Sequence, residues 1–85
     1  AGSNAMSLDK VSYLKNANQM EYLFTYAGSD VVSDYLAMMK SAMIDQLSKE
    51  SWAKVLKMNS VTVKIVFYSP SGKFLGTTSI SPSEY

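Results

Sequence analysis

Hydrophobic and polar side chains alternate most regularly in the C-terminal third of the chain. Val, Val, Ile and Phe recur at every second position over residues 61–67, and residues 74–80 form a second β-prone run. A period of two is typical of a strand with one buried face. The intervening residues 69–72 read Ser-Pro-Ser-Gly, in which Pro70 suits the second position of a type I turn and Gly72 can adopt a positive φ. The segment therefore predicts a β-hairpin.

A helical period replaces this alternation in the middle of the chain. Over residues 30–48, apolar residues recur at spacings of three and four and form one stripe. The members of the stripe are Val32, Leu36, Met39, Met43 and Leu47. This pattern predicts an amphipathic helix that packs on the sheet, with Ser29 or Asp30 as its N-cap. Trp52 and the apolar residues after it predict a short second helix or a kinked continuation.

The N-terminal region leaves two alternatives open. Residues 20–26 alternate between apolar or aromatic and more polar side chains, which favours a strand. Residues 7–15 carry only a weak pattern, which fits a short helical turn. The apolar residues at helical spacing in this stretch are Leu8, Val11 and Leu14. A continuous helix over residues 7–26 is the alternative.

Together these elements predict one small α+β domain. It would have a three-stranded antiparallel sheet in the order β-α-β-β, with one main amphipathic helix packed on one face. Three strands with a helix are close to the minimum for independent stability. Residues 1–5 resemble an expression-tag remnant, and residues 6–85 form the domain. If Met6 is the native start, no secretory signal precedes the domain and we expect a cytoplasmic protein.

Composition removes most catalytic chemistry. The chain contains no cysteine and no histidine, which are the usual thiolate nucleophile, general base and zinc ligands. Its acidic residues are not paired at a spacing that suits acid–base catalysis or a hard metal ion. Its glycines form no phosphate-binding loop. We therefore expect no enzymatic activity, no catalytic residues, no metal and no cofactor.

Charge argues against two further classes of partner. The net charge is +1, and all basic residues are lysines, so bidentate arginine recognition of guanine or phosphate is absent. Tyrosines near lysines could stack single-stranded bases, but no basic RNP-like motif accompanies them. A nucleic-acid partner is thus disfavoured. No apolar run reaches the length of about 18 residues that a membrane span needs, so we expect no membrane insertion.

The predicted hairpin has apolar side chains on the face that would turn away from the helix. Strict alternation places Val66, Tyr68 and Leu75 there, and Tyr22 is a fourth candidate interaction residue. A small sheet also leaves its edges free to pair with another chain. The sequence predicts a protein–protein interaction module of adaptor or inhibitor type, acting through a sheet edge or this apolar face. A homodimeric structural module is the alternative.

Residues 30–85 also resemble the C-terminal domain of the TonB/TolA energy-transducing proteins. The resemblance is carried by the helix sequence Tyr35-Leu36-x-x-Met39-x-x-x-Met43-Ile44, the strand over residues 61–67, the turn at 69–73 and the return strand over 74–80. The family continues into another helix and a last strand. In a rearranged relative, the strand over residues 20–26 would fill the missing third position of the sheet. The resemblance implies a bacterial, periplasmic domain that binds other proteins.

Overall fold

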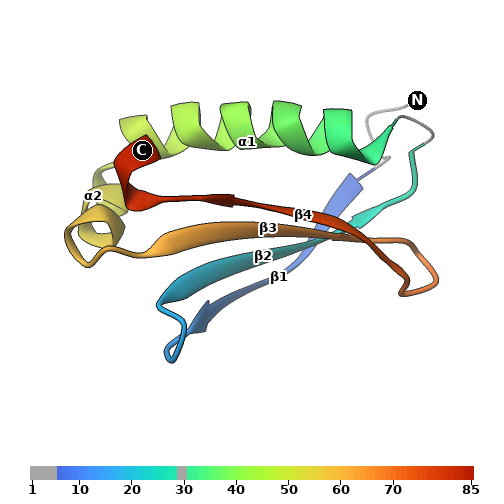
Figure 1. Cartoon of the computed structure of the whole chain (residues 1–85), viewed down its shortest axis with the longest axis horizontal. Helices are drawn as coiled ribbons and strands as arrows, with labels where there is room; N and C mark the ends of the chain where they lie inside the picture. Colours follow the sequence, from blue (N-terminus) through green and yellow to red (C-terminus); the bar gives the residue numbers. More distant parts are fainter. Residues whose placement is uncertain (1–5, 29–30) are drawn as a thin grey trace.

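The computed structural model describes residues 6–28 and 31–85, so the candidate N-caps Ser29 and Asp30 lie outside the described residues. Figure 1 shows a single sheet with α1 lying along one side of it. The elements are β1 (Met6–Leu14), β2 (Gln19–Tyr26), α1 (Val32–Lys49), α2 (Ser51–Met58), β3 (Thr62–Tyr68), β4 (Phe74–Ile80) and the 3-10 turn η2 (Pro82–Glu84). The α+β class and the C-terminal hairpin are confirmed. The prediction of three antiparallel strands is wrong, because the sheet has four strands in the order β1-β2-β3-β4 and is mixed.

The fourth strand is β1, which forms an antiparallel hairpin with β2. Its register shifts between Leu8 and Lys10, so Asp9 is the extra residue of a β-bulge. A bulge interrupts the strict alternation of side chains. The apolar residues Leu8 and Val11 therefore stand three positions apart, as they would on a helix, although both belong to one strand face. Both helical predictions for this region are wrong, because residues 6–14 and 19–26 are strands. The bulge explains why the spacing of the apolar residues resembled that of a helix.

The two hairpins meet along β2 and β3, which run parallel. Parallel neighbours require a crossover connection, and α1 with α2 supplies it. Directly paired residues point to the same face of a sheet, so the pairing of Tyr22 with Ile65 fixes the faces of both strands. We call the face that bears α1 the helix side and the other face the far side. The helix side of the two central strands consists of Met20, Tyr22, Phe24, Val63, Ile65 and Phe67.

Helix α1 lies along β4 (Figure 1), and its Tyr35 ring reaches the Phe67 ring of β3 at 5.8 Å. Leu36 and Leu47 are buried, and the rest of the predicted stripe packs half-buried against the core. The predicted stripe is therefore confirmed. Gly76 of β4 allows the close approach, since a Cβ there would lie 2.9 Å from Leu36 Cδ1 and 3.2 Å from Val32 Cγ1. These contacts fix α1 on the β4 half of the sheet.

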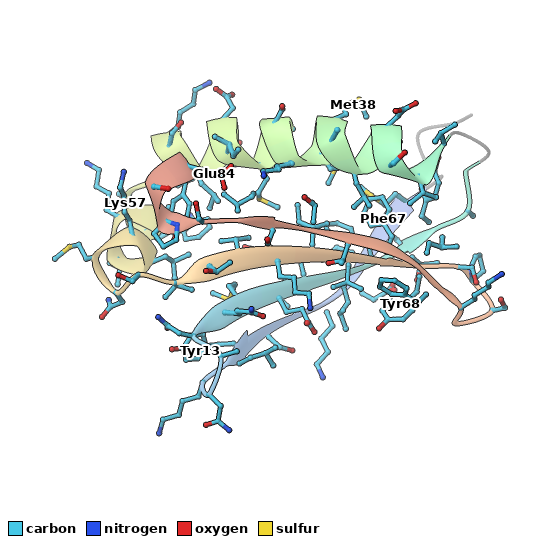
Figure 2. All side chains as sticks on the ribbon, viewed as in Figure 1. Tyr13, Met38, Lys57, Phe67, Tyr68 and Glu84 are labelled. Carbon is cyan, nitrogen blue, oxygen red and sulfur yellow. The ribbon has the colours of Figure 1, made fainter. Side chains whose placement is uncertain are left out.

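Aromatic rings fill the core beneath the first half of α1. The ring of Tyr26 stacks on Phe67 at 5.5 Å and lies 4.8 Å from the ring of Tyr35. Phe24 meets the same Phe67 ring edge-on at 5.8 Å. Figure 2 shows Phe67 between the sheet and the helix. Such aromatic pairs stabilise a core beyond the area they bury.

The two turns at the hairpin ends depend on positive φ. Gly72 has φ 91°, and its N–H donates to the Ser69 carbonyl at 2.9 Å, which confirms the predicted turn. Asn18 has φ 50° in the β1–β2 turn, and its side-chain amide donates to the carbonyls of Asn59 at 2.9 Å and Ser60 at 3.1 Å. Asn18 thereby joins the first hairpin to the end of α2.

The residues after β4 fasten the helices to the sheet. Glu84 forms a capping box with Ser81 and an ion pair with Lys40 of α1 at 3.2 Å. The hydroxyl of the buried Tyr85 donates to the Val61 carbonyl at 2.6 Å. This tail therefore contacts α1 and the start of β3 at once.

Candidate interaction surface

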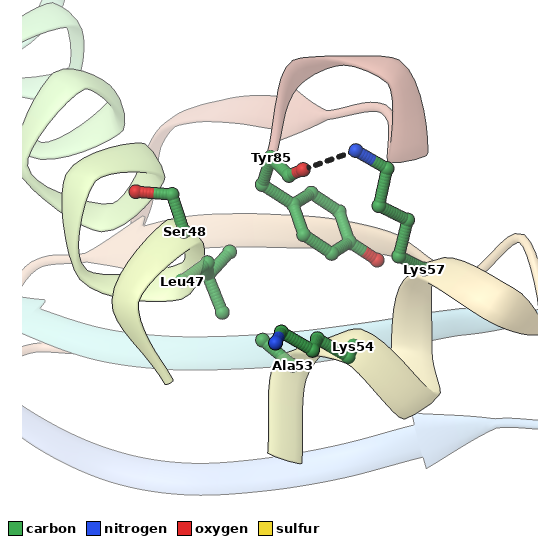
Figure 3. A pocket seen from close by; sticks show the side chains of 6 residues that line it. All are labelled: Leu47, Ser48, Ala53, Lys54, Lys57 and Tyr85. Carbon is green, nitrogen blue, oxygen red and sulfur yellow. Dashed lines mark hydrogen bonds between the residues drawn. The ribbon is translucent and has the colours of Figure 1, made fainter. Parts of the chain in front are cut away.

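A hollow of about 240 Å³ lies where α1, α2 and the C-terminal tail meet (Figure 3). Its lining consists of Leu47, Ser48, Ala53, Lys54, Lys57 and Tyr85. The Lys57 ammonium donates to the Tyr85 carbonyl at 2.8 Å, so it is engaged in holding the tail. Within residues 6–28 and 31–85 no group of three acidic, histidine or cysteine side chains could hold a metal ion. Two of its polar lining residues, Lys57 and Tyr85, thus take part in contacts that hold the tail.

A second, more open hollow of about 320 Å³ lies over the first turns of α1. Its described lining consists of Val31, Asp34, Tyr35 and Met38. Among the described residues that line it, the only titratable side chains are those of Asp34 and Tyr35, which are neighbours on α1.

Two of the four predicted interaction residues lie on the far side. Val66 is only 4% exposed, between its cross-strand neighbours Leu23 and Thr77. Tyr68 is half-buried, and its ring meets Phe74 edge-on at 5.9 Å. Val66 is therefore too well covered by its own sheet to offer contact area, whereas Tyr68 and Phe74 form a small aromatic pair at one end of the far side.

The other two predicted residues point elsewhere. The register of β3 with β4 shifts next to the turn, so Phe74 stands opposite Tyr68 and Leu75 is the extra residue. Leu75 packs half-buried against the core rather than beside Val66, as strict alternation had predicted. Tyr22 lies on the helix side, where burial raises the pKa of its phenol. The structure thus does not bring the four residues together into one surface.

The far side of the sheet is mostly polar. Its residues on the three strands β2 to β4 include Glu21, Thr25, Thr62, Lys64, Thr77 and Ser79. Polar residues on one face and apolar residues on the other are the usual pattern of a sheet with one solvated face. The far side therefore resembles a solvated surface, apart from the aromatic pair at its end.

The helix side, in contrast, is left open over β1. Pairing places Leu8 beside Phe24 and Val11 beside Tyr22, so these side chains point toward the side that carries the core. Yet Leu8 is 51% exposed, Val11 45% and Tyr13 52%. Among the described residues, α1 lies along β4, and neither α1 nor α2 makes more than slight contact with β1 (Figure 1). We call the helix side of β1 the open face; it is formed by the exposed Leu8, Val11 and Tyr13 and by Met6, which is half-buried against the core.

Helix α2 also carries exposed apolar side chains. Trp52 and Val55 are 46% and 59% exposed. The backbone carbonyl of Asn59, the residue that follows α2, accepts a hydrogen bond from the Asn18 side chain in the β1–β2 turn. The hydroxyl of Tyr13 donates to the Asn18 side-chain oxygen at 2.7 Å, which places Tyr13 beside the same turn. Tyr13 and the C-terminal end of α2 therefore meet at Asn18, at this end of the sheet.

The backbone of β1 adds a second feature to the open face. Within the part of the chain that the structure describes, β1 pairs with β2 alone and forms one edge of the sheet. It is a nine-residue strand, longer than β2, β3 or β4. An edge strand presents N–H and C=O groups that can pair with another chain. Sequence reasoning missed this strand because the bulge at Asp9 concealed its alternation.

Comparisons with known proteins add no family to this description. No protein-family model, curated protein or solved structure matches the chain. The resemblance to the TonB/TolA domain thus stays a prediction. Among the described helices, none is long and apolar enough to cross a membrane. A function must therefore be inferred from the geometry of the open face and the β1 edge.

Proposed function

We propose that this chain is a non-enzymatic protein-interaction module that binds through the β1 edge and the open face beside it. The observation that carries the proposal is the exposure of Leu8, Val11 and Tyr13, each 45–52%, on β1, an edge strand of the sheet. Isolated exposed apolar residues are ordinary on protein surfaces. A contiguous apolar patch beside a free strand edge is typical of an interaction site.

Energetics support binding at this place. Fully burying a large aliphatic or aromatic side chain contributes about 1.5–3 kcal/mol, so covering the exposed half of Leu8, Val11 and Tyr13 would contribute about 2–4 kcal/mol in total. Pairing of the β1 backbone with a strand of the partner would add hydrogen bonds and fix the register. The far side offers a partner less apolar area to bury, because its centre is polar and Val66 is already covered by its own sheet.

Capture from extracts of the source organism tests the proposal. The Leu8→Lys, Val11→Glu double variant places charges on the open face, whereas Ser7→Lys with Ser12→Glu places the same charges on the far side of the same strand. We expect proteins retained by the unchanged chain and by the control to be lost from the open-face variant, and further copies of this chain count among them. Identical sets on all three baits, with native circular dichroism spectra, would contradict the proposal.

A further inference from the structure

We infer that the partner bound by β1 is a second copy of this chain, paired antiparallel across a two-fold axis between Asp9 and Lys10. This inference rests on the proposed function and names the occupant of the same edge. It follows from the order in which β1 distributes its side chains between the two faces. It also follows from the adjacent opposite charges at the centre of the strand.

The bulge makes the face pattern of β1 symmetrical. Met6, Leu8, Val11 and Tyr13 pair with helix-side residues of β2 and lie on the helix side. Ser7, Lys10 and Ser12 pair with far-side residues of β2 and lie on the far side. Asp9 joins them, because its carboxylate accepts a hydrogen bond from the hydroxyl of Thr25, which lies on the far side beside Tyr68. Read in either direction from the Asp9–Lys10 bond, the order of faces is therefore the same.

An antiparallel second copy centred on this bond would match every pair. Leu8 would stand opposite Val11 of the second copy, and Met6 opposite Tyr13, with all four on the helix side. On the far side, Ser7 would stand opposite Ser12, and Asp9 opposite Lys10. Cross-strand apolar pairs and opposite charges each stabilise a sheet. The two-fold axis makes each of these contacts twice.

Shifting the register by one residue in either direction removes this match. One shift places Asp9 opposite Asp9 and Leu8 opposite Lys10, and the other places Lys10 opposite Lys10 and Leu8 opposite Ser12. Both set like charges against each other and oppose residues of different faces, which is unfavourable. A bulge and a lysine often protect an edge strand from pairing. In this register the bulge aligns the faces and the lysine meets a carboxylate, so neither feature opposes pairing.

Such a dimer would also extend the apolar surface. Two four-stranded sheets would join into one continuous sheet, with the open faces of both copies adjacent at its centre. Each α1 would lie toward an outer edge, along β4 of its own copy (Figure 1). The exposed halves of Leu8, Val11 and Tyr13 would then contact their counterparts across the seam.

Charge reversal in solution tests this register. Asp9→Lys alone and Lys10→Asp alone each create two like-charge pairs, and we expect the dissociation constant of the dimer to rise about tenfold in each. An equimolar mixture of the two variants restores opposite charges in both pairs, as does the double variant Asp9→Lys, Lys10→Asp. Sedimentation equilibrium should therefore show weak association for each single variant and recovery in the mixture and the double variant. Thr25→Ala is the control, because it removes the hydrogen bond to Asp9 without changing charge at the seam.

Two results would overturn the inference. One is a monomeric unchanged protein at all accessible concentrations. The other is a dimer whose dissociation constant is the same in the single variants, the mixture and the unchanged chain. A monomer that still loses captured proteins through the open-face variant would refute self-pairing and leave the proposed function standing. If all baits capture the same proteins and no charge-dependent dimer forms, both the self-pairing of β1 and the proposed function are refuted.

Discussion

Truncation of Leu47 should destabilise the fold strongly, because this side chain is buried where the C-terminal end of α1 packs against the core. Leu47 is 2% exposed and belongs to the core cluster that includes Ala53 and Tyr85. A buried Leu→Ala change removes transfer free energy and leaves a cavity, at a cost of about 2–5 kcal/mol. A domain of this length has a total stability of about 4–12 kcal/mol. Leu47→Ala should therefore remove a large part of the free energy of unfolding.

Met38→Ala on the same helix is the matched control. Met38 is 56% exposed and points away from the sheet (Figure 2). Its truncation removes a similar volume without creating a cavity, and alanine favours a helix, so we expect a change below about 0.5 kcal/mol. Urea unfolding followed by far-UV circular dichroism, at one protein concentration, measures both. Similar midpoints for the two variants would mean that α1 presents a different side to the core, and the account of its packing would fail.

Three further predictions concern the turns and the tail. Gly72→Val forces a β-branched residue to a φ of 91° and should cost about 1–3 kcal/mol in thermal unfolding; no loss would contradict the turn geometry. Asn18→Ala should destabilise more than Asn18→Gly, since both lose the amide hydrogen bonds but glycine accepts a φ of 50°; the reverse order would contradict this reasoning. The pKa of Glu84 is held below its ordinary range by the hydrogen bond from the Ser81 N–H and then by Lys40, so the stability it contributes is present above the ordinary pKa and lost as pH falls through the lowered one. Glu84→Gln should therefore lower the melting temperature at pH 7, and this difference should shrink as the pH falls through the lowered pKa; a difference that stays constant with pH would contradict the assignment.

The parts of the fold that the sequence predicts are those in which apolar residues recur at a regular spacing without interruption. The strand over residues 61–67 alternates strictly, and a turn sequence follows it, so the hairpin was evident. The stripe on α1 was equally regular, and the structure buries or half-buries each of its members. In both elements one local rule decides which side chains face the core.

Two β-bulges explain the main errors. The bulge at Asp9 concealed β1, because it changes the spacing of Leu8 and Val11 from two to three. The bulge beside the second turn moved Leu75 onto the core and Phe74 onto the far side. A bulge depends on the partner strand as well as on the local sequence, so a pattern within one strand does not specify it.

The parallel pairing of β2 with β3 was also missed by the predictions from the sequence. It joins residues more than forty positions apart, such as Gln19 and Thr62, through a crossover that no local motif announces. This pairing places Tyr22 on the helix side, opposite to Val66, and separates the predicted interaction residues. The exposure of the open face likewise follows from where α1 lies over the sheet, which is a property of the whole fold.

Site-directed disulfide formation tests most directly whether β1 pairs with a second copy. The chain has no cysteine, so Ser7→Cys and Ser12→Cys each introduce a single thiol. In the proposed register residue 7 stands opposite residue 12 of the other copy, at a Cα separation of about 4.5–5.5 Å that a disulfide can span. Two copies of residue 7 would be about 16 Å apart. The account predicts covalent dimers on mild oxidation of the mixture and none from either variant alone, whereas no dimer from the mixture, or equal yield from a single variant, would contradict it.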